Sequence, residues 1–115
     1  METTVDLLRS VNHAQYKAGQ TKGHYESFFI RANHPLKPQA FWIRYTIFSP
    51  NNEPEKGLGE LWGVFFDGEN NDHTALKQEF PLADCHFSNQ DFNVDLPTAH
   101  LSTGKARGTL TQQDN

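Results

Sequence analysis

The chain has 115 residues, a formal net charge of −4 and an apolar content of 36%. This length suits one domain with a core of its own, and an acidic balance without a run of lysine or arginine excludes a nucleic-acid partner. Nine Phe, two Trp and three Tyr concentrate the apolar volume. We therefore expect one domain with an aromatic core.

The first 22 residues differ from those that follow. Val5, Leu8 and Val11 lie at helical spacing, which predicts either a short amphipathic helix or an N-terminal arm that orders against a neighbour. The segment has acidic residues and no long apolar stretch, so it predicts neither a secretory signal nor a membrane span. The single cysteine, Cys85, has no partner for an intramolecular disulfide. A reducing, cytoplasmic location is the expectation.

From residue 24 the hydrophobic pattern has a period of two. Aromatic and β-branched segments at 24–32, 41–49 and 58–67 are separated by the turn sequences NHPLKPQ and PNNEPEKG, and they predict three consecutive strands. Weaker strands are expected at 73–81, 86–96 and 99–110, followed by a polar tail at 111–115. The predicted fold class is all-β, an antiparallel meander over residues 23–110 that forms a barrel, an open half-barrel or a sandwich.

Arg44 is a charged residue in the middle of an otherwise apolar strand. If the loops pair residues of equal parity, Glu26 on the preceding strand and Glu60 on the following strand share its face. A guanidinium between two carboxylates is satisfied on both sides, so the pattern predicts a Glu26–Arg44–Glu60 cluster. The alternative is that these charges only set the strand register or lie at a solvated rim, because cross-strand ion pairs are common and weak.

The same predicted face also carries large aromatic side chains. Small-molecule sites combine a mainly apolar lining with a few placed polar groups, and we expect such a cavity around Arg44. The predicted ligand-binding residues are Glu26, Phe28, Trp42, Arg44, Glu60, Trp62 and Phe66. On the opposite face, Gly59 and Gly63 predict that another surface approaches the sheet closely.

Other candidate sites are weaker. The six histidines show no ligand spacing, so neither a metal nor a cofactor is predicted. Residues 67–72 resemble a calcium loop in composition only, and a solvated turn is expected. Cys85 and His86 point to opposite sides of a strand, which excludes a nucleophilic dyad and favours Cys85 as a small apolar filler. Gly104 and Gly108 are expected to permit bending or close packing of the last strand.

Five short motifs, taken in order, resemble a known family. They are HYESFFIRANHP, AFWIRYTIFSP, GELWGVFFDGE, ALKQEFP and STGKARGTL, and they are similar to the N-terminal part of the lipocalin-like AttH family, which includes carotenoid hydratases of the hydroxyneurosporene synthase type. The likeness covers about residues 23 to 110. It implies a calycin-like β-barrel, usually one of two such domains, with a cavity for a hydrophobic ligand. The matching positions are Glu26, Ser27, Trp42, Arg44, Tyr45, Glu60, Trp62, Phe66 and Asp67, and none of them transfers as a catalytic residue.

The chain differs from members of this family in one respect. Family members continue beyond the strand that carries Gly104 and Gly108, whereas this chain ends there. A natural short form, a truncated product and a fragment of a longer protein are all compatible with this. A barrel that is not closed leaves an unpaired strand edge, which predicts a homodimer or a higher assembly.

Three functions follow as hypotheses. The first is a binding module for a terpenoid or lipid-like molecule, with Arg44 and its two glutamates orienting a polar end. The second is a truncated hydratase or cyclase in which Glu26 or Glu60 donates a proton and Arg44 stabilises negative charge. A neighbouring guanidinium favours the carboxylate over the acid that such a donor needs. The third is a structural domain that associates with itself or a partner through an apolar face.

Overall fold

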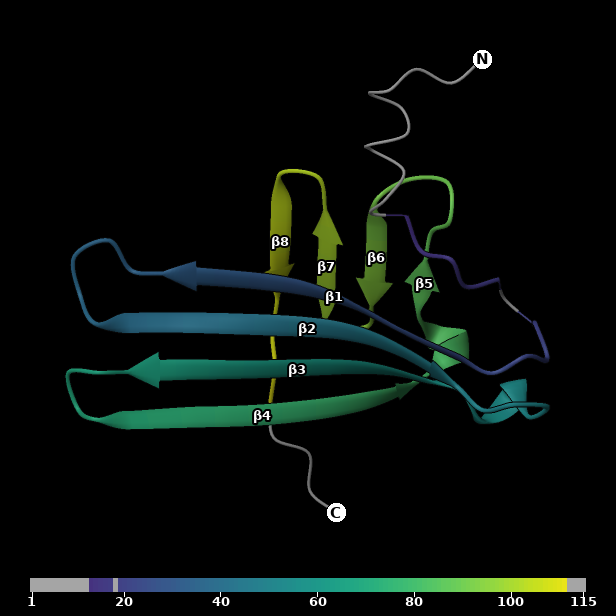
Figure 1. Cartoon of the computed structure of the whole chain (residues 1–115), viewed down its shortest axis with the longest axis horizontal. Helices are drawn as coiled ribbons and strands as arrows, with labels where there is room; N and C mark the ends of the chain where they lie inside the picture. The colour runs from purple at the N-terminus through teal and green to yellow at the C-terminus, as the bar shows by residue number, and fades with distance from the viewer. Residues whose placement is uncertain (1–12, 18, 112–115) are drawn as a thin grey trace.

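The computed structural model describes residues 13–17 and 19–111, and its strands form two four-stranded antiparallel sheets (Figure 1). Sheet A has the order β1 (His24–Asn33), β2 (Gln39–Ser49), β3 (Leu58–Asp67) and β4 (Asp72–Pro81). Sheet B has the order β5 (His86–Phe87), β6 (Asn93–Leu96), β7 (Ala99–Ser102) and β8 (Lys105–Gly108). Two short 3-10 helices, η1 (Pro54–Lys56) and η2 (Leu82–Asp84), complete the elements of the described chain.

The predicted all-β antiparallel class is confirmed, but the described strands form two open sheets rather than one closed barrel. The helix expected around Val5, Leu8 and Val11 lies outside the described residues. No helix in residues 13–17 and 19–111 is long and apolar enough to cross a membrane.

The described residues contain eight strands where the sequence predicted six. The first four agree with the prediction, whereas each of the last two predicted strands is divided by a turn. In the first turn, Ser88 Oγ accepts hydrogen bonds from the backbone N–H groups of Gln90 and Asp91, both at 3.2 Å. In the second, Gly104 has a φ of +73°, a conformation that favours glycine. Serine and glycine are typical turn residues, but the weak hydrophobic pattern of this region did not indicate that strands end there.

The strands of sheet B cross those of sheet A and cover only part of one face (Figure 1). We call this covered face of sheet A the inner face, and the opposite one the outer face. The core lies between the inner face and sheet B, where Ile47, Leu61 and Val94 are almost fully buried. The ends of the β1–β2 and β3–β4 hairpins extend beyond sheet B (Figure 1). Part of the inner face is therefore not covered by sheet B.

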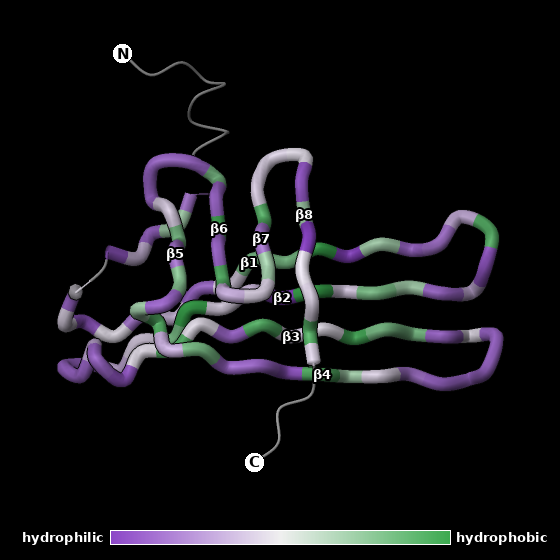
Figure 2. Tube along the Cα trace, turned by 180° about the vertical axis from the view of Figure 1, so that it is seen from behind, coloured by the Kyte–Doolittle hydropathy of each residue, from purple (hydrophilic) through white to green (hydrophobic). Residues whose placement is uncertain are grey.

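The segment that follows β8 continues across the inner face of sheet A (Figure 2). Its Thr111 exchanges two hydrogen bonds with Gln78 of β4, each at 3.2 Å. Leu110 lies over Gly63, where an added Cβ would be 2.5 Å from Leu110 Cδ2, and Gly59 lies against the Cys85 side chain. The predicted close approaches at Gly59 and Gly63 are confirmed.

The register of β1 differs from the predicted one. Glu26 is paired with Ile47 and Phe29 with Arg44, so even positions of β1 share a face with odd positions of β2. The last pair before the β1–β2 turn is Asn33 with Ala40, and a hydrogen bond from His34 N to Gln39 O (2.8 Å) lies next to it. An even number of residues, 34–39, separates the two paired residues, so an odd position of β1 pairs with an even position of β2. Glu26 and Phe28 therefore lie on the inner face, opposite to Arg44. The predicted Glu26–Arg44–Glu60 cluster is wrong.

Candidate functional site

A row of alternating aromatic and cationic side chains crosses the outer face of sheet A. Arg44 Cζ lies 4.8 Å from the ring centroid of Trp62 and 5.9 Å from that of Trp42. Lys77 Nζ lies 4.6 Å from the Trp62 ring on the next strand. We call this row, Trp42, Arg44, Trp62 and Lys77, the Trp–Arg ladder. Cations over indole faces attract the ring quadrupole, so Arg44 is stabilised by aromatic rings.

The carboxylates near the ladder bind Lys77. Its Nζ lies 2.8 Å from Glu60 Oε2 and 2.9 Å from Glu79 Oε1. Hydrogen bonds, first to Glu60 and then to Glu79, raise the pKa of Lys77. Arg44 Nε and Trp62 Nε1 are buried and have no acceptor among the described residues. Glu60 is therefore bound to Lys77, which is not among the predicted site residues.

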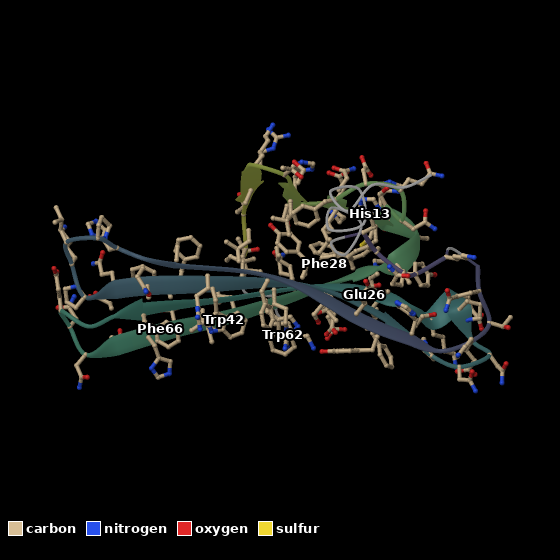
Figure 3. The ribbon with its side chains drawn as sticks, turned by 45° about the horizontal axis from the view of Figure 1, so that its top comes forward. His13, Glu26, Phe28, Trp42, Trp62 and Phe66 are labelled. Atoms are coloured by element: carbon tan, nitrogen blue, oxygen red, sulfur yellow. The ribbon has the colours of Figure 1, made fainter. Side chains whose placement is uncertain are left out.

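The predicted site residues are divided between the two faces (Figure 3). Those on the outer face, pointing away from sheet B, are Trp42, Arg44, Glu60, Trp62 and Phe66. Glu26 and Phe28 lie on the inner face. The register thus separates the residues that were expected to line one cavity.

On the inner face, Glu26 and Phe28 contact other parts of the chain. Both carboxylate oxygens of Glu26 accept from the Gln15 backbone N–H, at 3.0 and 3.2 Å, and Oε1 lies 2.9 Å from His24 Nε2. The Phe28 ring packs with those of Phe87 and Phe92, with centroid distances of 6.3 and 6.1 Å. Glu26 therefore holds the N-terminal segment and Phe28 belongs to the core.

An apolar groove of about 280 Å³ opens between the inner face of sheet A and β8 with the segment that follows it. Its apolar walls include Ile30, Phe41, Ile43, Tyr45, Leu61 and Leu110. Arg107 and Thr109 add polar groups to the lining, and Phe41 is 40% exposed. The sequence showed the odd-numbered apolar face of β2, but the groove forms only because β8 and Leu110 lie over it.

Tyr45 lies at the base of this groove. Its hydroxyl donates to the His100 backbone carbonyl at 3.4 Å, and burial raises its pKa. The side chain is 2% exposed. Tyr45 therefore joins the groove to sheet B as a neutral phenol.

A wider hollow of about 770 Å³ lies near η1, η2 and β5, and Cys85 and His86 are part of its lining. Cys85 Sγ is 3.6 Å from the Pro81 carbonyl oxygen. Burial first, and then the charge of Asp84, raise the pKa of the Cys85 thiol to about 11. A reactive cysteine needs the opposite pKa shift, so the Cys85 thiol is not activated.

Within the described ranges, no group of three or more His, Cys, Asp or Glu side chains is placed to hold a metal ion.

Comparisons with known proteins returned nothing: no protein-family model, no curated protein and no solved structure matches the chain. The resemblance of the sequence motifs to the AttH family therefore stays a prediction.

Proposed function

We propose that this chain is a binding module for an apolar small molecule, which it holds in the groove between the inner face of sheet A and β8. The observation that carries the proposal is the apolar lining of this groove, with Phe41 exposed at its wall. A volume of about 280 Å³ lies just below the range of known ligand pockets, so the groove holds part of a terpenoid or lipid-like chain.

The groove is a better candidate than the Trp–Arg ladder on the outer face. Arg44 already packs against two indole rings, and Glu60 already pairs with Lys77. The groove instead has unfilled apolar space between two sheets. We take this pair of crossed sheets as the half-open form of a lipocalin-like barrel, in agreement with the family resemblance of the motifs.

Retinol, a fluorescent isoprenoid alcohol, is a suitable probe for this proposal. Phe41 and Phe66 lie near the same end of sheet A on opposite faces, with 40% and 43% of each residue exposed. Losing an aromatic contact costs on the order of 1–2 kcal/mol, or roughly tenfold in Kd. We expect Phe41→Ala to raise the Kd for retinol about tenfold, while Phe66→Ala leaves it unchanged.

Two results would count against the groove. If Phe66→Ala weakens binding and Phe41→Ala does not, the ligand lies on the outer face. If neither retinol nor any apolar molecule that co-purifies in native mass spectrometry binds the folded protein, the chain is not a binding module.

A second candidate function is self-association through the outer face of sheet A. Phe29 is 70% exposed and Tyr25 61%, with Phe48 and Phe66 also exposed on this face. Exposed apolar patches of this kind mark interaction sites. Light scattering after size-exclusion chromatography tests it, because Phe29→Ser should convert a dimer to a monomer. The homodimer predicted from an open sheet edge would instead remain a dimer when Phe29 is replaced by Ser.

The hydratase or cyclase alternative is less favoured by the geometry. The enzyme hypothesis requires Glu26 and Glu60 to line the same cavity, but the two side chains project from opposite faces of sheet A. Glu60 also forms an ion pair with Lys77 at 2.8 Å, so its carboxylate is already bound to a cation of the neighbouring strand. Assays of prenyl substrates with Glu60→Gln test this alternative, and we expect no difference from the unmodified protein.

A further inference from the structure

Three polar side chains form a hydrogen-bonded line on the face of sheet B that is turned away from sheet A. Asp95 of β6 is directly paired with His100 of β7, and Ser102 lies two positions further along the same strand. His100 Nδ1 is 2.6 Å from Asp95 Oδ1, and His100 Nε2 is 2.9 Å from Ser102 Oγ. The alternate residues Val94 and Leu101 are buried in the core, so the line lies on the other face of the sheet.

The chemistry of the three groups assigns their hydrogen atoms. An ionised carboxylate only accepts, so Nδ1 of the neutral imidazole carries the proton and donates it to Asp95. Nε2 is then an acceptor, and the Ser102 hydroxyl donates to it. Asn93 Nδ2 donates to the second carboxylate oxygen of Asp95 at 3.2 Å, which restrains that side chain. These are the roles of nucleophile, general base and orienting carboxylate in a serine hydrolase.

Two cations lie beside the line. Lys105 is directly opposite Ser102, and Arg107 is directly opposite His100, on the neighbouring strand β8. Paired residues share a face of the sheet, and both cations are exposed. A hollow of about 400 Å³ next to the imidazole is lined in part by Asp95, His100 and Arg107, and Ser102 lies outside this lining. Positive charge next to a nucleophile stabilises the oxyanion that forms when a carbonyl is attacked.

We propose that Ser102, His100 and Asp95 form a hydrolytic site for small carboxylic esters. Ser102 Oγ attacks the ester carbonyl carbon and its proton passes to His100 Nε2. The tetrahedral intermediate breaks the bond to the leaving alcohol, which takes that proton, and the acyl group stays on Ser102. Water then attacks the acyl-serine with His100 again as base, and the carboxylic acid leaves as Ser102 regains its proton. Asp95 is a positioning residue that holds the imidazole.

The first test is covalent labelling of the whole chain with a fluorophosphonate, which a nucleophilic serine attacks with loss of fluoride. Peptide mapping should find the label on Ser102. Ser27 is the matched control, because it is a strand residue whose Oγ pairs with the Thr46 hydroxyl at 3.0 Å rather than with an imidazole. A label that is equally distributed between Ser27 and Ser102 would overturn the proposal.

The second test is hydrolysis of p-nitrophenyl acetate. We expect Ser102→Ala and His100→Gln each to lower the rate about 10²-fold, and Ser27→Ala to have no effect. All of these positions are outside the core, and thermal unfolding of each variant checks that it folds. If the rate survives in Ser102→Ala and is lost in His100→Gln, the imidazole itself attacks and the assignment of Ser102 is wrong.

Asp95→Asn tests the positioning role. The Asn amide can donate to Nδ1 and thereby favour the tautomer in which Nε2 carries the proton and cannot accept from Ser102. Labelling of Ser102 should fall, and the nitrogen chemical shifts of His100 should report the changed tautomer while the unfolding temperature stays the same. A changed tautomer with undiminished labelling would show that Ser102 does not depend on this base.

Discussion

Arg44 and Trp62 stand directly opposite each other on β2 and β3, with the guanidinium carbon 4.8 Å from the centroid of the indole ring. Trp42 lies at 5.9 Å, two positions from Arg44 on its own strand. A guanidinium is planar and weakly hydrated, so aromatic faces suit it better than they suit an ammonium. The charge within the apolar strand is therefore accommodated by stacking, and no acid from β1 is needed.

Replacement of Arg44 should weaken the fold only moderately. We expect Arg44→Met to lower the free energy of unfolding by about 1 kcal/mol, the contribution of a partly desolvated cation–π contact. Removal of the buried Nε, which has no acceptor among the described residues, offsets part of the loss. Urea denaturation measures the change, with the exposed Arg31→Met as control. A loss above about 3 kcal/mol would indicate a buried ion pair instead.

The register predicts which charges are coupled. In double-mutant cycles, we expect Glu60 and Lys77 to interact by about 0.2–1 kcal/mol, as partly exposed ion pairs do. Glu26 and Arg44 should show no interaction, since they lie on opposite faces of sheet A. A significant coupling between Glu26 and Arg44 would contradict the observed pairing of β1 with β2.

Cys85 should react slowly in the folded protein. Its pKa is raised to about 11, chiefly by burial, so only on the order of a thousandth of the thiol is ionised at pH 8. We expect iodoacetamide to modify the folded chain about 10²-fold more slowly than the urea-unfolded chain. Equal rates in the two states would show that the thiolate is not disfavoured by the fold.

The same shift predicts how stability depends on pH. The folded protein holds the Cys85 proton more tightly than the unfolded chain, so this contribution to stability is complete below the ordinary thiol pKa of 9.0 and is lost as the pH rises towards about 11. Unfolding temperatures measured across this window should fall less in Cys85→Ala than in the unmodified protein. If the unfolding temperature falls equally with pH in both proteins, the pKa of Cys85 is not raised by folding.

Two glycines should differ in their tolerance of a side chain. At Gly108 an added Cβ would lie 2.9 Å from the Thr98 carbonyl oxygen and 2.8 Å from Ala99 Cα, and these backbone atoms cannot move easily. At Gly63 the closest atom is the end of the Leu110 side chain, which can rotate away. We expect Gly108→Ala to cost about 1–3 kcal/mol and Gly63→Ala less. Thermal unfolding compares the two variants. An equal loss of stability would show that the Leu110 side chain does not move aside.

Much of the fold could be predicted from local patterns. Alternation of apolar residues located the strands of sheet A, and the glycines on the odd face of β3 indicated that another surface approaches there. The division of the last two predicted strands was missed because β5 to β8 are short, from two to four residues each. A period of two cannot be established over so few positions. The polar turn at Ser88 and the glycine at 104 were the signals that could have located these turns.

The candidate site was predicted less well than the fold. The aromatic residues and Arg44 were correctly placed in strands, but Glu26 and Phe28 were assigned to the wrong face because the β1–β2 loop reverses parity. A change of one residue in register moves a whole set of side chains to the other face. Lys77 was not considered as a partner of Glu60, since it lies in one of the weaker predicted strands.

The all-β class and the two faces of each long strand can be read from local sequence, because side-chain alternation is a property of the local backbone. Three features come instead from the packing of distant segments: which face sheet B covers, the position of Leu110 over Gly63, and the line of Asp95, His100 and Ser102. These contacts depend on the parity of loops and on the crossing of two sheets, which bring together residues that no short stretch of sequence relates.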